Sequence, residues 1–160
     1  MLSCVFAGSF DPVTAGHMDI ISRAAVLFGK VRVTVMHNVH KSGSISVEER
    51  IHLLQKACKC FPNVEVDRWE GLLADYMRDR GESILIRGCR NASEFEQEYT
   101  ASLVNKRLYN QFETLLIPSN PQLSAVSSSA VREVFRFGGD IAGLVPDECL
   151  KDIQKLLSKK

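Results

Sequence analysis

The sequence lacks a long hydrophobic run and has no excess of charge of either sign. None of its apolar stretches approaches the roughly 20 residues that a membrane-spanning helix needs. The apolar start, residues 1–7, is too short for a secretory signal peptide and has no basic flank. With 20 Lys and Arg against 19 Asp and Glu, the net charge is +1, which argues against nucleic acid as the main partner. We therefore expect a cytoplasmic protein with no membrane or nucleic-acid partner.

The sequence lacks the cysteine and histidine spacing of a metal site. The five cysteines are odd in number, and neither a CxxC pair nor a histidine cluster accompanies them. This argues against a zinc site, and we expect no residue to ligate a metal. Three of the histidines have no spacing typical of catalysis, and we interpret them as loop or surface residues: His37, His40 and His52.

Short strand-like runs alternate with helical patterns along the chain. The runs lie at residues 1–7, 31–36, 64–66, 84–86 and 114–117. Apolar residues at helical spacing separate or follow them, and Ser46 with Glu49 and Ser93 with Glu96 form capping boxes that predict two helix starts. The second of these helices should end near Leu108. The alternation predicts an α/β fold, a Rossmann-like, doubly wound parallel sheet of five strands, in a single domain over residues 1–160.

The segment between the first strand and the first helix, residues 8–17, reads GSFDPVTAGH. Gly8 and Gly16 permit close backbone approach or positive φ, while Pro12 fixes φ, so the loop has a defined shape. His17 falls in the first helical turn, where unpaired N–H groups and the helix dipole favour a phosphate. A histidine at a helix start can also be a cap without chemistry. Beside two glycines and the Ser9 hydroxyl, we favour a phosphate donor.

Other loops at the predicted carboxyl ends of strands carry groups suited to phosphate. Arg87 and Arg90 flank a glycine after a buried strand, and two guanidinium groups there would repel unless an anion lay between them. In the serine run at residues 127–129 one serine can cap a helix, which leaves two hydroxyls for phosphate. Glu98 can either suit its helix dipole or hydrogen-bond a ribose. Because ligands of such sheets bind beyond the carboxyl ends of the strands, these loops predict one nucleotide site.

Two segments resemble signatures of the nucleotidyltransferase superfamily. Residues 8–17 resemble G-[ST]-F-D-P-x-[TH]-x-G-H, and residues 126–132, VSSSAVR, resemble ISSSxxR. Over nearly its whole length the chain resembles the bacterial phosphopantetheine adenylyltransferases. Thr14 supports the narrower resemblance, because TxGH is typical of these enzymes, whereas HxGH is usual in transferases for other acceptors. The segments at residues 48–50, 86–90 and 94–96 support it as well.

The resemblance implies a reaction, a cofactor and an assembly. The reaction would be reversible adenylyl transfer from ATP to 4′-phosphopantetheine, giving dephospho-CoA and pyrophosphate, with Mg²⁺ as cofactor and coenzyme A as an inhibitor. The assembly would be a homohexamer, a dimer of trimers. Apolar residues within 95–108 and Phe112 fit either such an interface or packing within one domain, and both alternatives stay open.

Family roles transfer to this chain by matched position. The implied catalytic residues are His17, Lys41 and Arg90. The implied ATP-binding residues are Ser9, Phe10, His17, Gly88, Cys89, Arg90, Glu98, Leu123, Ser124, Ala125, Val126, Ser127, Ser128 and Ser129. The residues implied to bind 4′-phosphopantetheine are Ser9, Lys41, Leu72, Leu73 and Arg87.

Five positions depart from the family's common residues and bear on adenine stacking, pantetheine contact and feedback inhibition: Ser42, Gly71, Gln97, Leu123 and Ala125.

Two alternative functions remain. A sister transferase for another acceptor, such as nicotinamide mononucleotide or glycerol phosphate, would share the fold and the first signature, and a nucleotide-binding sensor would need no catalytic histidine.

Overall fold

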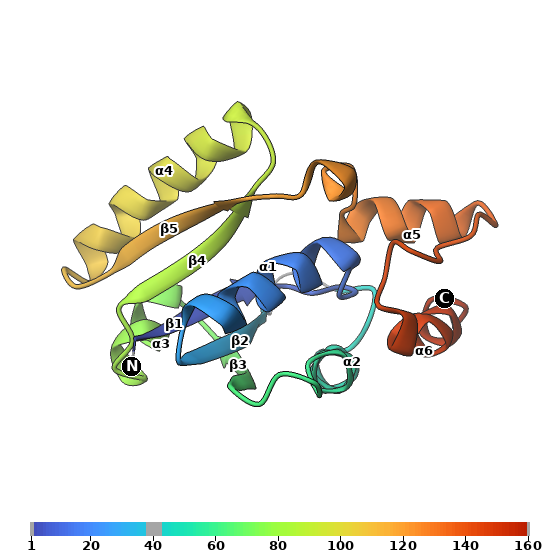
Figure 1. Cartoon of the computed structure of the whole chain (residues 1–160), viewed down its shortest axis with the longest axis horizontal. Helices are drawn as coiled ribbons and strands as arrows, with labels where there is room; N and C mark the ends of the chain where they lie inside the picture. Colours follow the sequence, from blue (N-terminus) through green and yellow to red (C-terminus); the bar gives the residue numbers. More distant parts are fainter. Residues whose placement is uncertain (1, 38–42, 160) are drawn as a thin grey trace.

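The computed structural model describes residues 2–37 and 43–159, and these form a single sheet of five parallel strands in the order β3-β2-β1-β4-β5. Figure 1 shows the sheet between layers of helices. The chain order reverses between β1 and β4, which are hydrogen-bonded neighbours. The strands are β1 (Ser3–Gly8), β2 (Lys30–His37), β3 (Val64–Glu70), β4 (Ile84–Cys89) and β5 (Glu113–Pro118).

Helices follow the strands as the sequence pattern predicts, and the predicted fold class is confirmed. In the described residues the α-helices are α1 (Ala15–Leu27), α2 (Val47–Ala57), α3 (Leu73–Asp79), α4 (Ala92–Leu108), α5 (Ser128–Arg136) and α6 (Leu150–Leu157). Short 3₁₀ turns cover Pro121–Leu123 and Asp147–Cys149. No helix among residues 2–37 and 43–159 is both long enough and apolar enough to cross a membrane.

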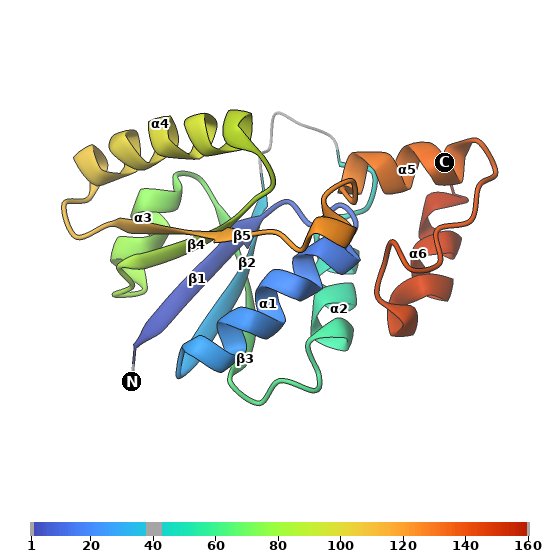
Figure 2. The same ribbon diagram turned by 45° about the horizontal axis from the view of Figure 1, so that its top comes forward.

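Successive side chains of β1 point to opposite faces of the sheet and fill two apolar clusters. Cys4 and Phe6 belong to the larger cluster, with buried residues of α1 and α2, whereas Val5 and Ala7 belong to the smaller one, with residues of α3. Figure 2 shows α1 and α2 on one side of the sheet and α3 and α4 on the other. The continuous apolar run of β1 therefore reflects a strand covered on both faces.

The structure corrects one prediction about α4 and decides between two alternatives for Phe112. The helix begins at Ala92, and Asn91 is its N-cap, because the Asn91 side chain accepts a hydrogen bond from the Glu94 N–H at 3.0 Å. The predicted capping box of Ser93 and Glu96 is wrong, since asparagine caps as well as serine and stands two residues earlier. Phe112 is 1% exposed in the smaller cluster, so it packs within the chain and not at an interface.

Candidate active site

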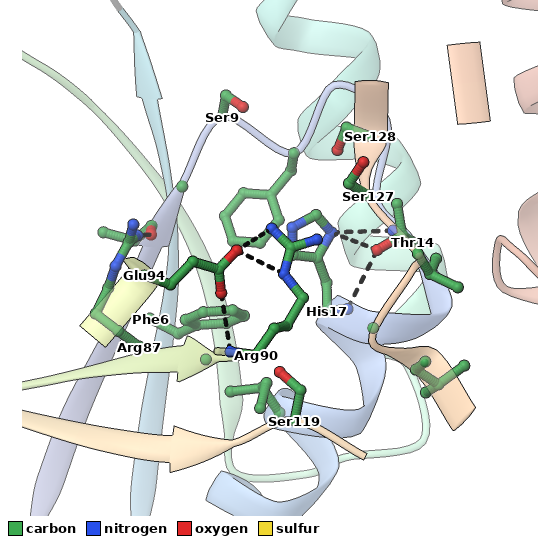
Figure 3. A pocket seen from close by; sticks show the side chains of 18 of the residues that line it. Phe6, Ser9, Thr14, His17, Arg87, Arg90, Glu94, Ser119, Ser127 and Ser128 are labelled. Atoms are coloured by element: carbon green, nitrogen blue, oxygen red, sulfur yellow. Dashed lines mark hydrogen bonds and ion pairs between the residues drawn. The ribbon is translucent and has the colours of Figure 1, made fainter. Parts of the chain in front are cut away.

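A pocket of about 370 Å³ lies at the carboxyl ends of β1 and β4, where the strand order reverses. This is the place at which doubly wound sheets bind their ligands. Figure 3 shows side chains from the β1–α1 loop, β4, α4 and the start of α5 around it. The predicted site residues that line it are Ser9, Phe10, His17, Arg87, Gly88, Arg90, Glu98, Leu123, Val126, Ser127 and Ser128.

Thr14 caps α1 and orients the imidazole of His17. The Thr14 backbone N–H donates to His17 Nδ1 at 3.0 Å, and Thr14 Oγ1 lies 3.0 Å from the same nitrogen. In return, the His17 N–H donates to Thr14 Oγ1 at 3.3 Å. Because Nδ1 accepts a backbone hydrogen bond, the proton of the neutral ring is on Nε2. His17 therefore presents an N–H donor through Nε2.

His17 remains neutral at physiological pH. Burial lowers its pKa from 6.5 to about 4, and the positive charges of Arg87 and Arg90 act in the same direction. The Phe10 ring packs edge-on against the imidazole, with 4.9 Å between centroids. Phe10 itself has φ of 47°, a left-handed conformation that is costly for a bulky residue, and its buried ring holds it there. The loop thus holds His17 partly buried, in a fixed place at the pocket wall.

Each site arginine is paired with a carboxylate of α4. Arg87 donates to Glu98 Oε1 from Nε at 2.9 Å and from Nη2 at 2.7 Å, and its Nη1 donates to the Ala7 carbonyl at 2.6 Å. Arg90 donates from Nε to Glu94 Oε1 at 2.7 Å. The sequence predicted that an anion must separate the two arginines, and the protein supplies two anions of its own. The Glu98 carboxylate is thus paired with Arg87 and does not simply complement the dipole of α4.

Side chains of the second signature, residues 126–132, contact the backbone of the first signature, residues 8–17. Ser127 caps α5 by accepting the Ala130 N–H at 3.1 Å, as one serine was predicted to do. Ser128 Oγ donates to the Pro12 carbonyl at 2.8 Å, and Arg132 Nη1 donates to the Asp11 carbonyl. The first backbone N–H groups of a helix have no intrahelical partner. The start of α5 is thus held beside the β1–α1 loop with N–H groups available for an anion.

The Asp11 carboxylate holds the segment that leads into α2 next to the same loop. It accepts the Ser44 N–H at 2.7 Å and the Ile45 N–H at 2.8 Å. The buried Arg50 side chain donates to the Ile45 carbonyl at 2.8 Å and to the Ser9 carbonyl at 3.0 Å. Lys41, which precedes this segment, and Ser42 and His40 lie outside the described residues.

Some predicted site residues do not line this pocket as described: Leu72, Leu73, Cys89, Ser124, Ala125 and Ser129. Leu72 is 56% exposed, and Leu73 packs against the smaller apolar cluster. Other lining residues were not predicted to bind: Phe6, Thr14, Glu94, Gln97 and Ser119. The sequence signal for Glu94 is its place four residues before Glu98, because residues four apart share a helix face.

The comparisons with known proteins agree with this geometry. A family model described as cytidylyltransferase-like matches residues 5–134. The chain is 46% identical to the phosphopantetheine adenylyltransferase of Clostridium tetani over 98% of each chain. It is 42% identical to that of Clostridium perfringens, over 96% of this chain and 94% of the relative. The chain also shares its fold with a Vibrio parahaemolyticus protein assigned as a nicotinate-nucleotide adenylyltransferase, with a TM-score of 0.66. The match covers 99% of this chain and 93% of the Vibrio chain, and the two sequences are 15% identical.

Proposed function

The chain belongs to the phosphopantetheine adenylyltransferases of the cytidylyltransferase-like family, and from this premise we propose the reaction that it catalyses. The phosphate of 4′-phosphopantetheine attacks the α-phosphorus of ATP, giving dephospho-CoA and pyrophosphate in coenzyme A biosynthesis. One new P–O bond forms as the bond to pyrophosphate breaks, and the step is reversible.

The observation that carries this proposal is a neutral His17 at a helix N-terminus, with Nε2–H as donor, in a pocket that also holds two arginines. Phosphoryl transfer is catalysed chiefly by positioning and by stabilising charge on the equatorial oxygens. The attacking phosphate is already ionised near neutral pH, because the second pKa of a phosphate ester is about 6. A site without a general base therefore suits this reaction.

We propose the residue roles that the family resemblance implies. His17 and Arg90 stabilise the charge that develops on the α-phosphate, with Lys41, which lies outside the described residues, as the third catalytic residue. Ser9 lies between the two substrates. Arg87, which lies in β4 and donates to the Ala7 carbonyl of β1, binds the phosphate of 4′-phosphopantetheine, and the start of α5 binds the triphosphate of ATP. The contacts of Ser127 and Ser128 with the α5 start and the β1–α1 loop support this division.

Mg²⁺ enters the proposal as part of the substrate, bound to the phosphates of ATP. Within the described residues no three His, Cys, Asp or Glu side chains gather to hold a metal ion. The two carboxylates of the pocket, Glu94 and Glu98, are engaged by arginines. Mg²⁺ commonly keeps several waters and binds through substrate phosphates, so this pocket suits it in that form.

The proposed assembly is a homohexamer, and the proposed location is the cytoplasm. The outer side of α4 supports the assembly, because it exposes a group of large apolar side chains: Phe95, Tyr99, Leu103, Val104 and Leu108.

The state of the cysteines supports the proposed location in the cytoplasm. All five cysteines are free thiols, as is usual in a reducing compartment. Inhibition by coenzyme A belongs to the same proposal, since coenzyme A contains both the pantetheine and the adenylyl part.

The reverse reaction tests the activity. The protein is incubated with Mg²⁺, dephospho-CoA and labelled pyrophosphate, and we expect labelled ATP. The matched control replaces dephospho-CoA with nicotinamide adenine dinucleotide, which a sister transferase would use. Labelled ATP from the control alone would assign another acceptor, and no labelled ATP from either would indicate a nucleotide-binding sensor.

A further inference from the structure

The charged side chains that line the pocket cancel one another, although its proposed ligands are strongly anionic. The described lining contains two positive charges, from Arg87 and Arg90, and two negative charges, from Glu94 and Glu98. His17 adds no charge, because its pKa is about 4. An anion that enters this pocket therefore meets arginines whose charge is already compensated.

Glu94 holds Arg90 through both its side chain and its backbone. Glu94 Oε1 accepts from Arg90 Nε at 2.7 Å and is also paired with Nη2, while Glu94 Oε2 accepts the Arg90 backbone N–H at 2.8 Å. Burial acts to raise the Glu94 pKa, but the hydrogen bonds and charge of Arg90 outweigh it, so the Glu94 pKa is lowered. Glu94 is therefore ionised in the free protein, and Figure 3 shows its carboxylate facing the guanidinium inside the pocket.

Glu94 occupies the edge of the Arg90 guanidinium that carries Nε and Nη2, and one oxygen, Oε1, contacts both nitrogens. Nε and Nη2 lie side by side and match two oxygens of a phosphate. A phosphate that binds this edge has to displace Glu94 Oε1 from it.

We propose that Glu94 is a competing internal anion, which occupies Arg90 in the free protein and which the polyphosphate of ATP replaces. This rests on the proposed function, in which the pocket binds ATP. Replacing the carboxylate costs free energy, and a polyphosphate, which carries more charge than a carboxylate, offsets this cost. Glu94 thereby lowers the affinity of the pocket for ATP.

The test is Glu94→Gln, with ATP and Mg²⁺ as the probe and isothermal calorimetry as the measurement. Glutamine keeps the length of the side chain and an oxygen that can accept the Arg90 backbone N–H, but it loses the charge. We expect the Kd for ATP to fall by about twofold to fivefold, the range for a partly exposed ion pair. Glu96→Gln is the matched control, since Glu96 is exposed on the same helix and carries the same charge; we expect its Kd to be unchanged.

A double-mutant cycle separates this role from a structural one. The effects of Glu94→Gln and Arg90→Ala on the Kd for ATP should not be additive, because Glu94 acts on ATP through Arg90. Glu94→Gln alone should also make the Kd for ATP more dependent on salt. Unchanged or weaker ATP binding by Glu94→Gln, or effects of the two substitutions that simply add, would overturn the proposal. If the wild-type protein itself does not bind ATP, the proposed function fails instead.

Discussion

Thr14 is the residue whose role changes most between sequence and structure. In the sequence it serves as a marker of the acceptor class, through the TxGH pattern. In the structure its hydroxyl caps α1 and its backbone N–H holds the Nδ1 of His17 at 3.0 Å. Thr14 therefore acts on the chemistry through His17, because it sets which ring nitrogen carries the proton.

Replacing His17 with alanine should lower turnover far more than it weakens ATP binding. The Nε2–H donor is expected to act mainly on charge that develops in the transition state, and loss of such a donor lowers kcat by roughly two to three orders of magnitude. Steady-state kinetics and calorimetry measure the two quantities separately. A variant with near-normal kcat and a raised Kd for ATP would show that His17 only binds the nucleotide.

The contribution of His17 to the stability of the fold should depend on pH below pH 6.5. Its pKa is about 4 in the folded protein and 6.5 for a histidine in water, so the unfolded chain binds the proton first. Its contribution to stability is complete above pH 6.5 and is lost as the pH falls from 6.5 towards 4. NMR titration of the imidazole should give a midpoint near pH 4. A midpoint of the imidazole near pH 6.5 would contradict the lowered pKa of His17.

Activity should still fall near pH 6, because the attacking phosphate takes up a proton at about that pH.

At the scale of elements, α1 and α4 contribute to the site in different ways. The start of α1 provides a capped N-terminus with His17 in its first turn. Along α4, Glu94 and Glu98 lie one turn apart and face the site arginines, while Phe95 and Tyr99 stack with centroids 6.4 Å apart. Although the whole of α4 is described, none of its residues is buried. The helix thus connects the pocket to an exposed apolar surface.

Removing the α1 cap should destabilise the protein and disturb His17 together. Thr14→Val keeps the shape of the side chain but loses the hydroxyl that accepts the His17 N–H. We expect the free energy of unfolding to fall by about 1 kcal/mol, as for other N-cap residues, together with a lower kcat. Chemical denaturation and kinetics provide the measurements. Thr14→Ser, which retains the hydroxyl, is the control, and equal losses in both variants would exclude the cap as the cause.

At the scale of the whole molecule, one pocket draws its residues from segments far apart in the chain. Ser128 and Arg132 contact the loop of residues 11–12 from the end of the fold at which α5 and α6 lie (Figure 1). The switch in strand order between β1 and β4 opens the space, and α4 closes one side of it. Because α4 lines the pocket and also exposes large apolar side chains, the proposed assembly and the site would share one helix.

Charge on the outer side of α4 should disrupt the proposed hexamer. Leu103 is 55% exposed, and Leu103→Glu would bury a carboxylate in an apolar interface. Light scattering coupled to size-exclusion chromatography should show the wild type as six chains of 17.9 kDa and the variant as a smaller species. Val26→Glu is the control, because Val26 is 86% exposed on α1. A wild type that elutes as a monomer would contradict the assembly.

The strand and helix pattern and the loop that places His17 at the start of α1 could be predicted because both depend on neighbours in sequence. Alternating apolar runs determine a doubly wound sheet, and residues 8–17 form one contiguous motif. The strand ends could not be predicted in the same way. β3 runs to Glu70 and β4 to Cys89, beyond the apolar residues that marked them, because pairing with a neighbouring strand extends them through polar positions.

The sequence by itself determined the fold class and the family, and it predicted many of the residues that line the pocket. The tertiary structure alone decided which charged groups meet. It pairs Glu94 with Arg90 and Glu98 with Arg87, and it buries Phe112 while leaving the apolar side of α4 exposed. The physical reason is that local patterns specify each element, whereas the direction in which a side chain points depends on how separate elements pack against one another.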